Sequence, residues 1–89
     1  MELSYLDLIQ DIENAVAVIL DYDALVYPYV DQEEGFVQLT VNDVDYLLYD
    51  NDIVSIVYRS SDAAYTVTMN NKDTYVIQLL ELKKLDNVI

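Results

Sequence analysis

The stretch that decides the fold is Phe36–Tyr49, which reads FVQLTV-ND-VDYLLY. Phe36–Val41 alternates in the period-two pattern of a strand with one buried face, and Val44–Tyr49 is the expected return strand after Asn42-Asp43. Asn42-Asp43 itself is a two-residue turn sequence that favours a tight hairpin. A loop of this length puts three pairs on one face, Val41 with Val44, Leu39 with Tyr46, and Val37 with Leu48. The other face then carries Phe36, Gln38, Thr40, Asp45, Leu47 and Tyr49.

Downstream of the hairpin, short polar turns separate further apolar segments. The turns are Asp50–Asp52, Ser60–Ala63 and Asn70–Asp73, and the strands expected between them are Ile53–Tyr58 and Ala64–Met69. The end of the chain, 75–85, is ambiguous between a strand and a helix, because Gln78–Lys84 contains good helix formers. We favour a strand that starts near Thr74, because the preceding Asn-rich turn suits another hairpin.

Upstream of the hairpin, residues 4–20 have the i, i+3, i+4 apolar spacing of an amphipathic helix. Ser4 and Asp7 form a capping-box sequence at its start. The β-branched stretch Ala15–Leu20 leaves a strand possible there. Ala24–Val30 is expected to be a strand, and Pro28 places it at a sheet edge or a bulge.

These elements predict an α+β fold with one N-terminal helix packed on an antiparallel meander of four to five strands. We expect residues 1–89 to form a single domain, because the chain is short and its composition is 54% apolar. No run of apolar residues is long enough for a transmembrane helix, and the start lacks the features of a signal peptide. With no Cys to form disulfides, we expect a cytoplasmic protein that does not associate with membranes.

Charge is the strongest compositional feature. The net charge is −13, from 17 acidic and 4 basic residues, and Met1–Tyr58 holds 13 of the acids without any Lys or Arg. The four bases, Arg59, Lys72, Lys83 and Lys84, are balanced by Asp62, Asp73, Glu81 and Asp86. A net charge of about 2–8 is enough to keep a small domain soluble, and a larger one opposes compaction. We therefore expect the excess to serve a positively charged partner.

Residue types that carry chemistry are scarce. The chain has no His, no Cys and a single Gly, so a catalytic triad, a thiolate site and a glycine-rich phosphate loop are not expected. Asp-x-Asp occurs at Asp21/Asp23, Asp43/Asp45 and Asp50/Asp52, but none continues as a calcium-binding loop. We predict a protein that is not an enzyme and has no cofactor and no dedicated metal site.

The Asp-x-Asp spacing has a second interpretation. On an extended chain, two such carboxylates point the same way about 6.5–7 Å apart, similar to the separation of neighbouring phosphates on a nucleic-acid strand. Tyrosine, present nine times, is enriched at protein interfaces. The predicted partner-binding residues are Asp21, Asp23, Asp31, Glu33, Glu34, Asp43, Asp45, Asp50, Asp52, Tyr29 and Tyr49.

With Leu8-Ile9 in an acidic N-terminal helix and an Asp-rich hairpin over Phe36–Asp52, the chain resembles phage-encoded acidic DNA-mimic inhibitors. These include anti-CRISPR proteins, anti-restriction proteins and uracil-DNA glycosylase inhibitors. The resemblance implies an inhibitor, monomeric or homodimeric, that occupies the basic nucleic-acid-binding channel of a host enzyme. A CRISPR effector nuclease is the first expectation, with no direct binding to nucleic acid. The alternatives are an immunity protein or antitoxin that neutralises a basic toxin, and an acidic homo-oligomeric structural protein.

Overall fold

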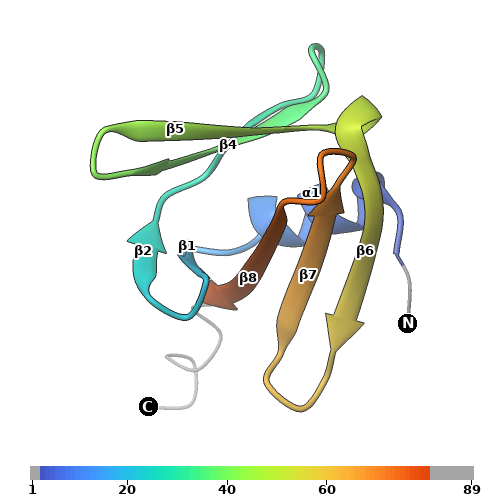
Figure 1. Ribbon diagram of the computed structural model, residues 1–89. Helices are drawn as coiled ribbons and strands as arrows, with labels where there is room; N and C mark the ends of the chain where they lie inside the picture. Colours follow the sequence, from blue (N-terminus) through green and yellow to red (C-terminus); the bar gives the residue numbers. More distant parts are fainter. Residues whose placement is uncertain (1–2, 81–89) are drawn as a thin grey trace, which may run out of the picture.

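The computed structural model describes residues 3–80 and contains one α-helix, a 3₁₀ turn and eight strands (Figure 1). In chain order the elements are α1 (Tyr5–Glu13), β1 (Ala17–Leu20), β2 (Ala24–Val26), β3 (Tyr29–Asp31), β4 (Phe36–Val41), β5 (Val44–Tyr49), η1 (Asp50–Asp52), β6 (Ile53–Arg59), β7 (Ala64–Met69) and β8 (Thr74–Leu80). Strand pairing is antiparallel throughout this part of the chain. The predicted α+β class, with an N-terminal helix on an antiparallel strand meander, is confirmed.

The strands divide into two sheets, which the sequence did not reveal. The large sheet has the order β2-β1-β8-β7-β6, and the small sheet has the order β3-β4-β5. The break falls at Tyr27-Pro28, so the strand expected over Ala24–Val30 is two short strands in different sheets. Because proline has no N–H to donate, it interrupts the ladder at this point. The β4–β5 hairpin then crosses one end of the large sheet (Figure 1).

The hairpin itself has the predicted register. Val41 pairs with Val44, Leu39 with Tyr46, and Val37 with Leu48. Asn42 and Asp43 have φ values of 51° and 67°, as a tight hairpin turn of this type requires. Local sequence is sufficient here, because the turn and the alternating pattern specify the same pairing.

The helix begins as predicted and ends earlier than predicted. The Ser4 hydroxyl accepts a hydrogen bond from the Asp7 N–H, and the Asp7 carboxylate accepts one from the Ser4 N–H, which completes the capping box. The helix ends at Glu13 rather than at residue 20, and Ala17–Leu20 is strand β1. The stiff β-branched side chains of this segment suit the sheet, where β1 lies between β2 and β8.

The ambiguous C-terminal segment is a strand as far as it is described. β8 starts at Thr74 and pairs with both β1 and β7, so it lies in the middle of the large sheet. Burial between two neighbours overrides the helix preference of its last residues. The part of the prediction that concerns 81–85 lies outside the described residues.

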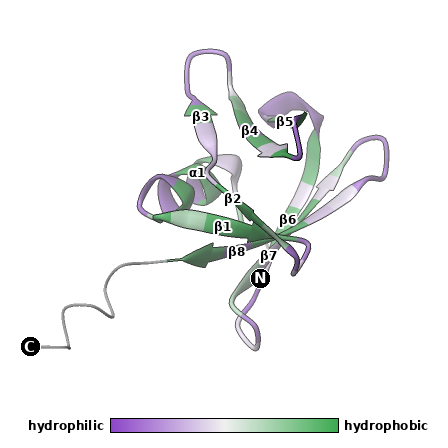
Figure 2. Cartoon of the chain, turned by 90° about the vertical axis from the view of Figure 1, so that its left-hand side faces the viewer, coloured by the Kyte–Doolittle hydropathy of each residue, from purple (hydrophilic) through white to green (hydrophobic). Residues whose placement is uncertain are grey.

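The core lies between the large sheet on one side and α1 with the small sheet on the other. Its buried members include Leu8, Ile9 and Ile12 from α1, Val37, Leu39 and Leu48 from the hairpin, and Val18, Ile56, Val67 and Ile77 from the large sheet. Figure 2 shows the hydrophobic strands meeting in this interior and the hydrophilic residues gathering in the turns. The outward faces of both sheets are therefore left without a covering layer among residues 3–80.

Candidate binding face

The outward face of the small sheet is the first candidate, and we call it the tyrosine–aspartate face. By strand alternation and register it consists of Tyr29, Asp31, Phe36, Gln38, Thr40, Asp45, Leu47 and Tyr49. Tyr29 is 56% exposed, Leu47 43% and Tyr49 37%, which is high for large apolar or aromatic side chains. The face thus offers contact area that the fold itself does not use.

Three aromatic rings form a row across this face. The centroid of Phe36 is 6.2 Å from that of Tyr29 and 5.2 Å from that of Tyr49, with both pairs tilted. Distances of this size are typical of favourable aromatic pairs. Each ring therefore supports its neighbour, and the row is held in place before any partner arrives.

Carboxylates lie at both ends of the tyrosine–aspartate face. Segment 29–52 contains seven acids and no base. Asp31 lies on the face next to the β3–β4 turn with Glu33 and Glu34, and Asp50 follows Tyr49 at the same end. The Gly35 carbonyl accepts a hydrogen bond of 2.8 Å from the Asp50 N–H, which ties these two segments together. Asp43 and Asp45 lie at the opposite end, around the β4–β5 turn.

Some of the predicted acids have structural roles. Asp31 accepts from the Glu34 N–H at 3.0 Å, Asp45 from the Thr40 hydroxyl at 2.6 Å, and half-buried Asp52 from the Asn70 amide at 3.2 Å. Other carboxylates are exposed and make no side-chain hydrogen bond or ion pair with any residue of 3–80; these are Asp23, Glu33, Glu34, Asp43 and Asp50. The charges of this second group are therefore not compensated by any side chain of residues 3–80.

The Asp-x-Asp pairs do not have the extended backbone on which their expected phosphate-like separation depends. Asp21 and Tyr22 have φ values of 53° and 62°, so the first pair belongs to a turn. Asp43 is also in the left-handed region, and Asp50–Asp52 form η1. The 6.5–7 Å estimate requires extended backbone, because only there do alternate side chains point the same way. The structure gives clustered charge in place of a regular ladder.

Asp21 and Asp23 lie apart from the tyrosine–aspartate face. They line a pocket of about 190 Å³ together with Tyr46 and Tyr75, and its remaining lining is apolar. Tyr46 and Tyr75 belong to the core-facing sides of β5 and β8, and both are only partly buried. The predicted hairpin register placed Tyr46 on the same face as Leu39, whereas no feature of the sequence singled out Tyr75. No local signal could have joined them, because the pocket depends on contacts between distant segments.

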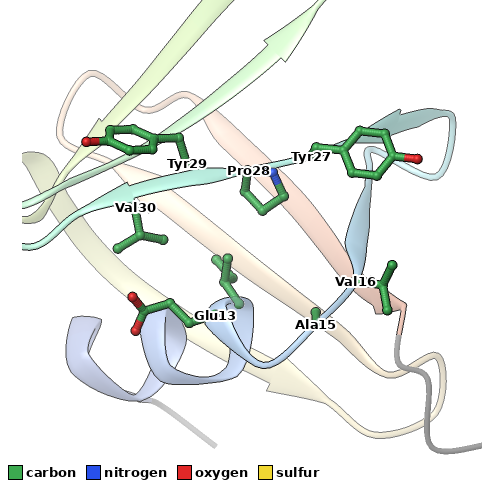
Figure 3. Close-up of a pocket in the computed structure, with 8 residues that line it drawn as sticks. Glu13, Ala15, Val16, Tyr27, Pro28, Tyr29 and Val30 are labelled. Carbon is green, nitrogen blue, oxygen red and sulfur yellow. The ribbon is translucent and has the colours of Figure 1, made fainter.

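A second pocket, of about 330 Å³, opens beside the C-terminal end of α1 (Figure 3). Tyr27, Pro28 and Tyr29 lie along one side of it, and Glu13 with the segment entering β1 lies along the other. The Glu13 carboxylate accepts both of its hydrogen bonds from the Gln32 amide at 3.0 Å. Sequence reasoning also missed this pocket, since it depends on where Pro28 turns the chain.

Tyr5 reports the electrostatic field beneath the small sheet. Its hydroxyl is buried and makes no hydrogen bond within residues 3–80. Burial raises the pKa of Tyr5, and the negative charges of Asp50, Asp31 and Glu13 raise it further. Acids from three elements thus act on one buried hydroxyl, which shows that the negative charge of this region is shared across α1, β3 and η1.

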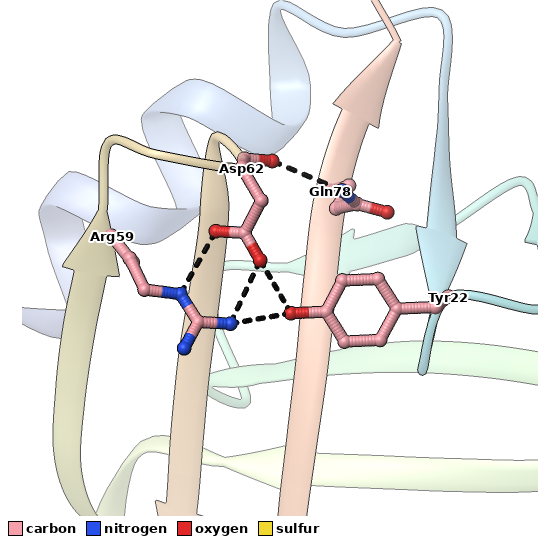
Figure 4. A network of polar contacts seen from close by, with 4 residues as sticks. All are labelled: Tyr22, Arg59, Asp62 and Gln78. Carbon is pink, nitrogen blue, oxygen red and sulfur yellow. Dashed lines mark hydrogen bonds and ion pairs between the residues drawn. The ribbon is translucent and has the colours of Figure 1, made fainter.

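The outward face of the large sheet carries a different polar group (Figure 4). The Arg59 guanidinium donates to both oxygens of Asp62, at 3.0 and 2.7 Å, and to the Tyr22 hydroxyl at 2.7 Å. Tyr22 in turn donates to Asp62 at 2.6 Å. These hydrogen bonds, first of all the one from Arg59, hold the pKa of Asp62 at about 2. The positive charge of Arg59 is therefore compensated locally by the Asp62 carboxylate.

Compared with known proteins, the chain matches no family model, no curated protein and no solved structure. Within residues 3–80, no helix has the length and apolar character needed to cross a membrane. The same residues hold no group of three or more acids placed to bind a metal ion. The features that bear on function are accordingly the two outward faces and the pockets beside them.

Proposed function

We propose that this protein is a non-enzymatic, cytoplasmic inhibitor that docks its tyrosine–aspartate face onto the basic nucleic-acid-binding channel of a host enzyme. The observation that carries the proposal is the exposed aromatic row bounded at both ends by carboxylates, in a segment with seven acids and no base. Like charges held this close repel one another, and a basic surface relieves that repulsion on binding. Electrostatic attraction also accelerates the encounter.

The aromatic row supports a protein partner in particular. Tyrosine buries a large ring and keeps a polar hydroxyl, which is why it is enriched at protein interfaces. Nucleic acid is unsuited as a direct ligand, because its phosphates and these carboxylates repel one another. A CRISPR effector nuclease is our first choice of target, since its channel for the heteroduplex is positively charged.

A second candidate is an immunity protein or antitoxin bound to a basic toxin. The observation in its favour is the turn geometry of the Asp-x-Asp pairs, which offers clustered charge and no regular phosphate-like spacing. Clustered charge is enough to complement a basic patch without imitating a nucleic-acid strand. The two candidates share the docking face and differ in whether DNA competes for the same surface.

The test is affinity capture from a host lysate with the tagged full chain, repeated with an excess of duplex DNA. We expect a basic nucleic-acid enzyme to be captured and then lost under competition, and its purified activity to be inhibited stoichiometrically. If the amount of captured protein is unchanged by the excess DNA, the result favours the immunity-protein candidate. Failure to retain any basic protein, with folded bait, contradicts both.

The matched variant neutralises four exposed acids, E33Q/E34Q/D43N/D50N. Each of these acids is expected to form one partly exposed ion pair with a base of the partner. Because the variant loses all four, we expect its affinity for the partner to fall about 30-fold or more. The same variant should unfold at a higher temperature than the wild type, because its self-repulsion is lower. A variant that is more stable and yet binds less cannot be explained by misfolding. Unchanged inhibition by this variant would refute the docking face.

A further inference from the structure

The Asp21/Asp23 pocket has two carboxylates that would attract a basic side chain. Its other walls are aromatic or apolar, which suits the aliphatic part of such a side chain. Two carboxylates stand at the β1–β2 turn, and the rings of Tyr46 and Tyr75 stand edge to face with centroids 5.9 Å apart. The volume of about 190 Å³ suits one long side chain and is too small for a nucleotide. Among residues 3–80, no Lys or Arg contributes to its lining.

The carboxylates keep acceptor capacity for a ligand. Asp21 uses one oxygen to accept the Val76 N–H at 2.9 Å, which fixes the side chain in place. Asp23 makes no side-chain hydrogen bond or ion pair with any residue of 3–80. An ionised carboxyl has about four acceptor positions, so the pair retains several. Tyr75 is partly buried against the core, and burial, followed by the charge of Asp73, raises its pKa.

We infer that this pocket receives a single arginine side chain of the protein partner. The guanidinium would lie against the two carboxylates, and its planar group suits both bidentate pairing and stacking on tyrosine. Its aliphatic stem would pack on Leu20, Ala24 and Val41, which complete the lining. The inference rests on the proposed function only in taking the partner to be basic, and it adds a second anchor beside the tyrosine–aspartate face.

The test uses Nα-acetyl-arginine amide as the probe and the ¹⁵N-labelled full chain as the receptor. We expect saturable chemical-shift changes confined to residues 20–24, 41, 46 and 75. The citrulline analogue has the same shape without the charge, and we expect it to cause no saturable change. Shift changes spread over all acidic turns, or equal responses to the two probes, would overturn the pocket.

The variants are chosen to keep the fold. D21N retains the oxygen that accepts the Val76 N–H, and Asn tolerates the left-handed backbone at this position. We expect D21N/D23N to bind the probe about tenfold more weakly, as for the loss of two partly exposed ion pairs. E33Q/E34Q removes the same charge at the far end of the small sheet and should bind it nearly as the wild type does. If both variants bound the probe equally weakly, the effect would come from the net charge alone, and the pocket would be refuted as a binding site.

The failure of this inference is separable from failure of the proposed function. If D21N/D23N captures and inhibits the partner as well as wild type does, the arginine pocket is wrong and the inhibitor proposal stands. If the pocket binds the probe and no basic enzyme is captured, the proposed function is wrong and the pocket stands.

Discussion

The two outward sheet faces have the same architecture and opposite chemistry. Each is the side of an antiparallel sheet that no other part of residues 3–80 covers, while the opposite side packs on the core. The tyrosine–aspartate face has an aromatic row and carboxylates without basic partners in its segment. The outward face of the large sheet is formed by residues such as Leu25, Val57, Thr66 and Gln78, and within residues 3–80 Arg59 is its one charged strand residue. That single charge is already paired with Asp62.

The difference teaches that the charge is unevenly distributed, since segment 29–52 alone carries seven of the 17 acids and no base. Scattered acids would serve solubility equally well on either face. Here seven acids lie around the small sheet, whereas Arg59, on the outward face of the large sheet, is held in a local ion pair with Asp62. A function in docking explains this division, and a general demand for solubility does not.

The largest expected effect comes from changing the same net charge on each face in turn. E33Q/E34Q and L25K/V57K both raise the net charge by two, the first at the tyrosine–aspartate face and the second on the large sheet, where both residues are exposed. We expect partner affinity, measured by calorimetry, to fall about tenfold for the first and by less than twofold for the second. Equal losses would show that the partner reads total charge, and the comparison between the faces would fail.

The sequence predicted correctly those structural features that depend on residues close together in the chain. The capping box at Ser4 and the register of the Phe36–Tyr49 hairpin follow from residues only a few positions apart. The end of the helix did not follow, because β1 exists only through its pairing with β2 and with distant β8. Tertiary pairing here outweighs the helical spacing of the apolar residues.

The candidate site was predictable in composition and not in arrangement. Tyr29, Tyr49, Asp31 and Asp45 were all expected to bind a partner, and the structure places them on one face. Asp21 and Asp23 were expected to belong with them and instead line a pocket with Tyr75, which is more than 50 positions away. Residue types indicate what a surface can bind. Which residues lie together on one surface depends on the break at Pro28, where the chain passes from the large sheet to the small sheet.

A smaller effect is expected from salt on the free protein. Charges around the small sheet repel one another, and a Debye length of about 8 Å at 0.15 M shortens to about 3 Å at 1 M. We expect the unfolding temperature of the wild type to rise by a few degrees between low and high NaCl, measured by circular dichroism. The rise should be smaller for E33Q/E34Q/D43N/D50N and unchanged for L25A, which alters no charge. The same rise in every variant would mean that the salt acts through apolar burial.

The smallest effect concerns the ion pair on the outward face of the large sheet. The pKa of Asp62 is lowered from 3.8 to about 2, so its pairing contributes stability above about pH 4 that is lost as the pH falls toward 2. Asp62 lies at the surface, and solvent screens the pair, so we expect only a modest loss of stability in D62N at pH 7. Urea unfolding at pH 7 and pH 2.5 should show the gap between wild type and D62N closing at the lower pH. A gap as large at pH 2.5 as at pH 7 would show that the Tyr22 and Arg59 contacts stabilise the turn without the charge on Asp62. Arg59, which stays charged at this pH, would then hold the turn by donating hydrogen bonds to Tyr22 and to the uncharged Asp62 side chain.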